Sequence, residues 1–280
     1  EGRIRPLDPR ALDDCARRGG TLLGSARSKV FPTAEGQARA REEIARARLS
    51  GLVVFGGNGS LTGARALETA EAPGGSPFRI GGVPSSIDND IGFVARSFGY
   101  LTAVEEARRV LECAHTEAIS TPGGIGLVKL MGRHAGFITA GATVASQDVN
   151  FALIPEVPFE LRSFLAALKV RMQHSSHAVI AVAEGAGQQL FEVADAPERD
   201  ASGNLRLKDI GQLLREKIDV YFKSEGLPVV LRYFDPSYQV RSRAANCEDA
   251  MLCDLFARNA VHAAMAGKTG IVIGFLHERF

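Results

Sequence analysis

Short apolar runs alternate with amphipathic helical patterns along most of this chain, and that rhythm constrains the fold more than any other feature. Runs rich in β-branched residues predict strands at 52–55, 80–83, 125–130, 151–154, 178–182, 229–231 and 271–273. Between them, apolar residues recur at spacings of three and four, which predicts helices at 34–49, 101–118, 161–173, 210–222 and 248–266. Apolar strands linked by helices form parallel sheets covered on both faces, so the chain is predicted to be an α/β protein.

The length and composition are those of an ordinary globular chain. With 280 residues and 45% hydrophobic content it can bury a large core, and its length suggests about two domains. A net charge of +1 gives no indication of a nucleic-acid or anionic membrane partner. No apolar run approaches the roughly 18 to 20 residues that cross a bilayer, and no charged-then-apolar leader opens the chain. We therefore expect a cytoplasmic protein without membrane contact.

The acidic segment 84–90, Pro-Ser-Ser-Ile-Asp-Asn-Asp, follows the short apolar run 78–83. A strand that ends in such a loop brings its side chains to the carboxyl edge of a parallel sheet, where α/β proteins bind their ligands. There, one carboxylate of Asp88 and Asp90 could accept a proton while the other holds a metal ion, as phosphoryl transfer to a hydroxyl requires. The same residues favour a simple turn, because Asp and Asn side chains bond their own backbone. Both interpretations stay open on these residues alone.

A glycine-rich turn, Gly-Gly-Asn-Gly-Ser-Leu-Thr-Gly-Ala at 56–64, links the run 52–55 to a helical pattern. Backbone N–H groups of such a turn can approach an anion at the helix N-terminus. The turn matches neither the dinucleotide-binding pattern nor the P-loop, and a tight turn without a ligand is the alternative. Upstream, Arg27 lies in a loop of small residues, from which its side chain could reach a phosphate or stay in solvent.

Other strand ends carry charged side chains in the same way. The segment 131–136, which contains Arg133, follows one strand, and Glu184 ends another. Arg232 and the segment 238–241 place two guanidinium groups around an aspartate-proline turn, and arginine pairs suit a bidentate grip on a phosphate ester. A structural arginine bonded to Asp235 is the alternative. Taken together, these strand ends predict a site for phosphorylated ligands.

The motifs GGNGS, SIDND, MGRHAGF, IPEVPF, AEGAG and DPSYQVR, in this order, resemble the 6-phosphofructokinase family over essentially the whole chain. The pattern is most similar to the branch with plant and trypanosomatid ATP-dependent enzymes. The resemblance implies two similar α/β/α, Rossmann-like domains with mostly parallel sheets and an active-site cleft between them. A nucleotide-binding domain would comprise 1–99 and 241–275, without its N-terminal strand, and a sugar-phosphate-binding domain 100–240. It also implies residues before Glu1, including a first glycine-rich loop, and after Phe280.

The resemblance assigns roles to individual residues. Asp88 would deprotonate the 1-hydroxyl of fructose 6-phosphate, and Arg133 would stabilise the transferring phosphoryl group. The amide of Asn58 and the carboxylate of Asp90 would hold Mg²⁺. The substrate would be bound by Ser86, Ile87, Asp88, Met131, Gly132, Arg133 and Glu184 around the sugar and by Arg232, Tyr238 and Arg241 at the 6-phosphate, and the nucleotide phosphates by Arg27, Ser28, Gly57, Asn58, Gly59 and Ser60.

Two positions bear on the phosphoryl donor. Pyrophosphate-using relatives typically carry aspartate at the position of Gly59 and lysine at that of Ser85, so this chain is predicted to use ATP. Two departures from the family pattern also matter. Asn58 replaces a usual aspartate with an uncharged and weaker ligand for a hard cation, which predicts reduced or more Mg²⁺-demanding activity. Gly124 stands where many bacterial relatives present an arginine to a neighbouring subunit, which puts a shared site in doubt.

The resemblance therefore implies an allosteric, glycolytic kinase that transfers the γ-phosphoryl group of ATP to fructose 6-phosphate with Mg²⁺. A pyrophosphate-dependent enzyme and a regulatory subunit of low activity are the alternatives, and a lipid or NAD kinase is a remoter one. The family habit implies a homo-oligomer, either a dimer or a tetramer. Glu156 lies where some relatives bind effectors.

Overall fold

The fold comes from a computed structural model that describes residues 4, 6–12, 15, 18–22, 24, 26, 28–68, 77–191 and 206–275. The chain divides into two compact units. Unit 1 comprises Glu1–Tyr100, Arg199–Asn204 and Arg243–Phe280, and unit 2 comprises Leu101–Glu198 and Leu205–Ser242. The main boundaries fall one or two residues from the predicted division at 99/100 and 240/241. Which unit binds which substrate stays a prediction.

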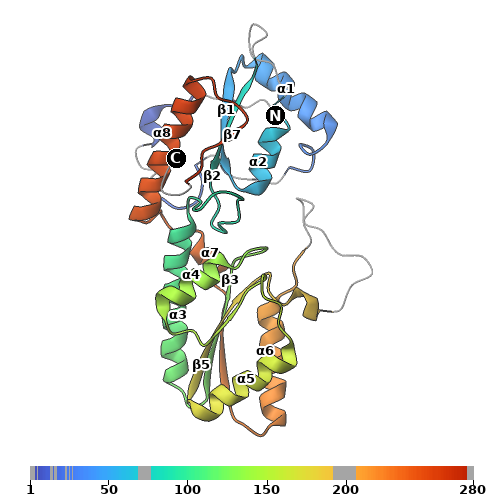
Figure 1. The fold of residues 1–280 in the computed structure, drawn as a ribbon, viewed down its shortest axis with the longest axis vertical. Helices are drawn as coiled ribbons and strands as arrows, with labels where there is room; N and C mark the ends of the chain where they lie inside the picture. The colour runs from blue at the N-terminus through green and yellow to red at the C-terminus, as the bar shows by residue number, and fades with distance from the viewer. Residues whose placement is uncertain are drawn as a thin grey trace. The chain divides into compact units, whose positions relative to one another are not determined.

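Unit 1 is built on a parallel sheet in the order β1-β2-β7, with β1 at Gly51–Gly56, β2 at Arg79–Pro84 and β7 at Ile271–Val272. Helices α1 (Ala34–Arg46) and α2 (Asn58–Arg65) cover one face, and α8 (Cys247–Met265) covers the other (Figure 1). Alternation along β2 supplies both faces: Ile80 packs against the α1 and α2 cluster, and Val83 against that of α8. A short 3₁₀ helix, Pro9–Leu12, precedes these elements.

Local sequence sets where the long helices of unit 1 begin. Thr33 accepts a hydrogen bond from the backbone N–H of Gly36 at 3.1 Å, which caps α1. Asn246 caps α8 in the same way, by accepting from the N–H of Asp249 at 2.9 Å. Both side chains satisfy donors that a helix leaves without an internal partner.

Unit 2 contains a four-stranded parallel sheet in the order β4-β5-β3-β6. Its strands are β3 (Gly124–Leu130), β4 (Phe151–Leu153), β5 (His177–Ala183) and β6 (Val230–Phe234). Helices α5 (Leu161–His174) and α6 (Ile210–Ser224) pack on one face, and α3 (Tyr100–Ile119) and α4 (Phe137–Ser146) belong to the other (Figure 1). The 3₁₀ turn Gln188–Leu190 and the short helix α7 (Ser237–Val240) follow β5 and β6.

The central strand β3 is buried along its length except at Lys129. Its glycines let α3 approach closely, since a methyl group at Gly126 would lie 2.8 Å from the carbonyl oxygen of Ala114. On the other face, Ile125 and Leu127 join the core formed with α5 and α6. The sheet of unit 2 therefore has a helical layer on each side, as the near-continuous apolar runs predict.

The predicted parallel α/β class is confirmed. Strands and long helices occur at the expected places, with ends that differ by a few residues, whereas the short helix α7 had not been predicted. Most of the polar stretch between the 3₁₀ turn Gln188–Leu190 and α6 lies outside the described residues. In the described parts of the chain, no helix combines the length and hydrophobicity that crossing a membrane requires.

Candidate active site

In unit 1, the carboxyl ends of β1 and β2 bring the glycine-rich turn and the acidic loop together. The register pairs Gly56 with Pro84, and the N–H of Ser85 donates to the carbonyl of Gly56 at 3.0 Å. A methyl group at Gly57 would lie 3.5 Å from Cβ of Ser86. The two loops predicted from sequence to share one sheet edge thus lie side by side.

The first turn of α2 follows directly from this junction. Asn58, Gly59 and Ser60 form that turn, and all three are exposed. Among the described residues, no heavy atom lies within 4 Å of a methyl group added at Gly59. Backbone N–H groups at a helix N-terminus attract anions, so this turn can receive a phosphate.

Ser86 connects the two acidic residues of the loop. Its hydroxyl accepts from the N–H of Asp88 at 3.3 Å and donates to Oδ1 of Asp90, also at 3.3 Å. The Asn58 amide donates to the backbone carbonyl of Asp90 at 3.4 Å. One carboxylate oxygen of Asp88 is buried, although the residue as a whole is half-buried. The predicted proton acceptor and the predicted metal ligand therefore lie on one fixed turn, next to the N-terminus of α2.

The intervening Asn89 has a structural role that the sequence had suggested for the whole acidic segment. It adopts a left-handed conformation with φ 54°, and its side-chain oxygen accepts from the N–H of Ser97 at 2.7 Å. The hydroxyl of Ser97 also donates to the carbonyl of Ser86 at 2.6 Å. Asn89 therefore closes a turn, as one of the two interpretations predicts, and the catalytic roles of Asp88 and Asp90 stay a prediction.

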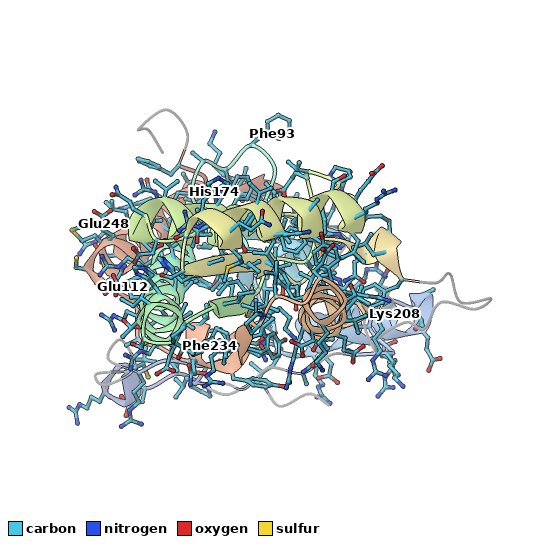
Figure 2. The ribbon with its side chains drawn as sticks, turned by 90° about the horizontal axis from the view of Figure 1, so that it is seen from below. Phe93, Glu112, His174, Lys208, Phe234 and Glu248 are labelled. Carbon is cyan, nitrogen blue, oxygen red and sulfur yellow. The ribbon has the colours of Figure 1, made fainter. Side chains whose placement is uncertain are left out.

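Beyond the acidic residues, the loop exposes an aromatic side chain. Phe93 is 96% exposed with φ 62°, and Figure 2 shows its ring projecting away from the ribbon. Its neighbour Ile91 is 8% exposed and anchors the loop.

In unit 2, the loops after β3 and β5 are bonded to each other. The N–H of Glu184 donates to the carbonyl of Leu130 at 2.9 Å, and that of Gly185 to the carbonyl of Gly132 at 3.0 Å. A methyl group at Gly185 would lie only 1.9 Å from the carbonyl oxygen of Arg133. Glu184 and the segment from Met131 to Arg133, predicted as parts of one site, are thus brought together.

The pKa of Glu184 depends on burial and on the charged side chains around it. Burial raises its pKa above the usual glutamate value, while the positive charges of Arg133, Lys129 and Arg241 partly offset that effect. These cations reach Glu184 from three different segments. A half-buried carboxyl group among cations can accept hydrogen bonds from sugar hydroxyls without carrying a full unbalanced charge.

The loop that carries Arg133 is also held from its far end. A carboxylate oxygen of Glu156 accepts from the N–H of Gly136, immediately before α4, at 2.7 Å. The sequence had indicated Glu156 only as a possible effector residue. In this structure it caps the helix that follows Arg133.

The residues predicted at the 6-phosphate divide into two places. Arg241 lies over the ring of Tyr238, 5.3 Å from its centroid, and Tyr238 is 76% exposed. Arg232 is in mid-strand, where its Nε is 4.0 Å from a carboxylate oxygen of Glu117. There it lines a cavity of about 740 Å³ between α3 and β6. The structure brings Tyr238 and Arg241 together but directs Arg232 toward α3.

The comparisons with known proteins decide the family. A family model described as phosphofructokinase matches residues 1–264 of this chain. The chain belongs to the phosphofructokinase family. The predicted similarity to the plant branch agrees with these comparisons. A relative from Arabidopsis thaliana, named ATP-dependent 6-phosphofructokinase 1, is 40% identical to this chain.

That Arabidopsis match extends over 279 residues, which is 98% of this chain and 58% of the relative. An ATP-dependent 6-phosphofructokinase from Borreliella burgdorferi is 40% identical over 283 residues, covering 98% of this chain and 62% of its own. The chain thus spans less than two thirds of the length of either relative. A solved structure of Pichia pastoris phosphofructokinase in the T-state has a TM-score of 0.79 at 23% identity, over 98% of this chain and 30% of that one. That likeness supports the fold.

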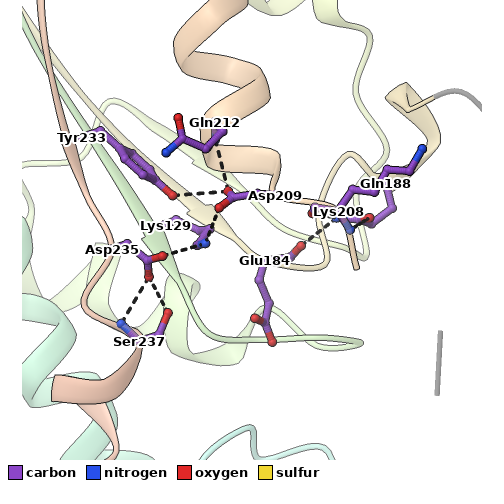
Figure 3. A network of polar contacts seen from close by, with 9 residues as sticks. All are labelled: Lys129, Glu184, Gln188, Lys208, Asp209, Gln212, Tyr233, Asp235 and Ser237. Carbon is purple, nitrogen blue, oxygen red and sulfur yellow. Dashed lines mark hydrogen bonds and ion pairs between the residues drawn. The ribbon is translucent and has the colours of Figure 1, made fainter. Parts of the chain in front are cut away.

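Within this phosphofructokinase fold, Lys129 forms a polar network that the sequence reading missed. Its side chain is 12% exposed, and its ammonium lies 3.0 Å from Oδ2 of Asp209 and 2.8 Å from Oδ2 of Asp235 (Figure 3). Burial opposes the charge on Lys129, but the hydrogen bonds to Asp235 and Asp209 outweigh it and raise its pKa. A lone lysine inside the apolar run 124–130 was the signal, because a buried cation requires partners.

The remaining predicted residues of this phosphofructokinase-family chain lie before α1. Ser28 is exposed, and its hydroxyl oxygen accepts from the N–H of Phe31 at 3.0 Å. Arg27 lies outside the described residues. Their assignment to the nucleotide phosphates stays a prediction.

Proposed function

We propose that the chain is an ATP-dependent 6-phosphofructokinase, which transfers the γ-phosphoryl group of ATP to the 1-hydroxyl of fructose 6-phosphate. The observation that carries the proposal is the Ser86 turn, which holds the proton acceptor Asp88 and the carboxylate of Asp90 beside the N-terminus of α2. Membership of the phosphofructokinase family supports it.

The roles divide between the two units. In unit 1, Asp88 takes the proton of the 1-hydroxyl as the phosphoryl group arrives, because a hydroxyl is a poor nucleophile until it loses that proton. The turn from Gly57 to Ser60 and residues Arg27 and Ser28 bind the nucleotide phosphates. Transfer of a phosphoryl group leaves little covalent chemistry to the protein, so positioning and charge stabilisation supply most of the catalysis.

In unit 2, Arg133 stabilises the charge on the transferring group. Met131, Gly132 and Glu184 bind the fructose. Tyr238 and Arg241 bind the 6-phosphate, since their side chains already lie together at one loop. Arg232 contributes less to this proposal, because it contacts Glu117 instead.

The residues of unit 1 fit a magnesium ion that accompanies the nucleotide. Mg²⁺ usually takes one or two carboxylates and completes its shell with phosphate oxygens and water. Asp90 offers the carboxylate, and the amide oxygen of Asn58 lies on the neighbouring turn. Within the described ranges, no three acidic, histidine or cysteine side chains gather as a metal-binding group. When bound, the ion would neutralise phosphate charge.

The choice of ATP over pyrophosphate rests on space and charge. Gly59 leaves the first turn of α2 open, and Ser85 brings no positive charge to the adjacent strand end. Both relatives quoted above are named as ATP-dependent. The proposal also includes a cytoplasmic location and a homo-oligomeric state.

The test is steady-state turnover of fructose 6-phosphate by the full-length protein, with ATP or pyrophosphate in parallel, over a range of Mg²⁺ concentrations. We expect turnover with ATP alone. Turnover with pyrophosphate would refute the donor assignment. If neither donor supports turnover but fructose 6-phosphate still binds measurably, the protein would be a regulatory subunit instead.

A variant pair tests the base. Asp88→Asn should lower turnover by about three orders of magnitude or more, because it removes the proton acceptor while conserving shape. Asp254→Asn is the matched control, since Asp254 forms an exposed ion pair with Arg258 on α8. Near wild-type turnover in a folded Asp88→Asn protein would show that another group is the base.

A further inference from the structure

We propose that Lys129 is a positioning residue of the sugar-phosphate half: it holds the loop ends that present Glu184, Tyr238 and Arg241 to fructose 6-phosphate. The inference rests on the proposed function and adds a residue to it. Lys129 itself touches no substrate in this proposal, and it acts through the carboxylates that it binds.

The first step is the place of Lys129 at the centre of several loops. It is the second-last residue of β3, and its ammonium bridges Asp209, at the start of α6, and Asp235, just after β6. The hydroxyl of Tyr233 donates to the other oxygen of Asp209 at 3.3 Å. Figure 3 shows the ammonium between the two carboxylates. A single side chain thus ties together segments that the sequence separates widely.

The second step leads from Asp235 to the predicted phosphate residues. Oδ1 of Asp235 accepts hydrogen bonds from both the N–H and the hydroxyl of Ser237, which begins α7. Tyr238 follows Ser237 in that helix, and Arg241 ends it and stacks on Tyr238. The carboxylate that Lys129 holds therefore also fixes the first residue of the helix that presents these two side chains.

The third step leads to Glu184. The carbonyl of Leu130, next to Lys129, accepts from the N–H of Glu184. On the other side, the Gln188 amide donates to the carbonyls of Glu184 at 2.9 Å and of Lys208 at 3.0 Å, and its oxygen accepts from the N–H of Lys208. Asp209, the next residue, closes the connection back to Lys129.

The arrangement differs from an ordinary surface ion pair. Lys169 and Glu225 form such a pair in the same unit, with side chains 29% and 31% exposed, and the pair links only α5 to the end of α6. Lys129 is less exposed and contacts two carboxylates at once. Without its charge, these carboxylates would repel each other across the space that the ammonium now fills. The turn at Asp235 is then expected to move.

The experiment compares Lys129→Met with Lys169→Met in the full-length protein. Steady-state kinetics give KM for fructose 6-phosphate, KM for ATP and kcat, and thermal unfolding checks the fold. Lys129→Met should raise KM for fructose 6-phosphate by about tenfold or more, which is typical when a residue that orients ligand-binding groups is lost. KM for ATP should change by less than about twofold, because the nucleotide residues belong to unit 1. Lys169→Met should change neither KM.

Lys129→Arg adds a conservative variant, since a guanidinium group can still bond two carboxylates. It should recover most of the affinity for fructose 6-phosphate. If Lys129→Met does not fold, Asp235→Asn replaces it, because it weakens the same contact and leaves Lys129 paired with Asp209. The same split between the two KM values is expected for that variant.

The outcomes separate this inference from the proposed function. A wild-type protein that does not turn over fructose 6-phosphate with ATP would overturn both. An active wild type with an unchanged KM for fructose 6-phosphate in a destabilised Lys129→Met or Asp235→Asn protein would overturn the inference alone, because Lys129 would then only support the fold. A rise in both KM values to the same extent would also contradict it.

Discussion

Gly185→Ala tests whether the loop of Arg133 has to stay where the structure places it. The added methyl group would lie 1.9 Å from the carbonyl oxygen of Arg133 and 2.7 Å from its carbonyl carbon. Carbon and oxygen atoms that are not bonded stay about 3.3 Å apart, so the loop has to retreat by more than about 1 Å. Both atoms belong to the backbone, and no side-chain rotation relieves the clash. Gly185 itself has no positive φ, so alanine brings steric contact and no backbone strain.

The displacement sets the size of the effect. Misplacing a reacting group by about 1 Å costs on the order of 100-fold in rate, and overpacking costs about 1–3 kcal/mol of stability. We therefore expect kcat to fall about 100-fold at saturating fructose 6-phosphate and ATP. KM for ATP should stay close to the wild-type value, since the residues proposed to bind the nucleotide belong to unit 1. Steady-state kinetics and urea unfolding measure both consequences.

Gly81→Ala provides the matched control. An alanine methyl group at position 81 meets no heavy atom of the described residues within 4 Å. It introduces the same chemical change without a clash. If a folded Gly185→Ala protein kept kcat within about twofold of the Gly81→Ala protein, the reasoning that Arg133 acts from a fixed loop would be refuted.

Further predictions concern the acidic loop, a helix cap and a buried acid. Ser97→Ala should lower the free energy of unfolding in urea by about 1–3 kcal/mol, because the carbonyl of Ser86 loses its donor; an unchanged unfolding midpoint would contradict this. Thr33→Ala should cost about 1 kcal/mol in the same titration by removing the cap of α1, and a loss below about 0.3 kcal/mol would show that the cap contributes little. Burial raises the pKa of Glu184 from 4.5, so the native state binds this proton more tightly than the unfolded chain. The stability from this group is fully present below pH 4.5 and is lost as the pH rises through the folded pKa, and Glu184→Gln should remove that part of the pH dependence of unfolding.

The fold was accessible from the sequence because its signals are local. Each apolar run predicts a strand and each amphipathic stretch predicts a helix. Their alternation then predicts that the strands pair in parallel. The glycine-rich turn and the acidic loop were also predictable neighbours, since adjacent parallel strands end at one sheet edge. In the structure, β1 and β2 pair over their whole length and bring these loops together.

Other parts of the site depend on contacts that no local pattern encodes. The sequence shows that Lys129 needs partners, but Asp209 lies 80 residues further along the chain, and only the sheet order brings them together. Asp235 had been considered as the partner of an arginine, and the structure pairs it with Lys129.

Strand alternation explains the placement of Arg232. Leu231 and Tyr233, on either side of it, pack against the core formed with α5 and α6. Successive side chains of a strand point to opposite faces, so Arg232 faces α3. Because Arg232 lies near the end of its strand in the sequence, it had been grouped with Tyr238 and Arg241. In the structure its side chain contacts Glu117 instead.

The discontinuity of unit 1 has a consequence for how the protein is made. Strands β1 and β2 precede unit 2 in the chain, whereas α8 and β7, which cover and extend their sheet, follow it. At about 5–20 residues per second, a ribosome needs roughly 7–28 s to synthesise the intervening residues 101–242. During that interval Leu252 and Phe256, the residues of α8 that pack with Val83, have not yet been synthesised. Synthesis of unit 2 is therefore complete before that of unit 1, and the face of β2 that carries Val83 lacks its helical cover until α8 has been made.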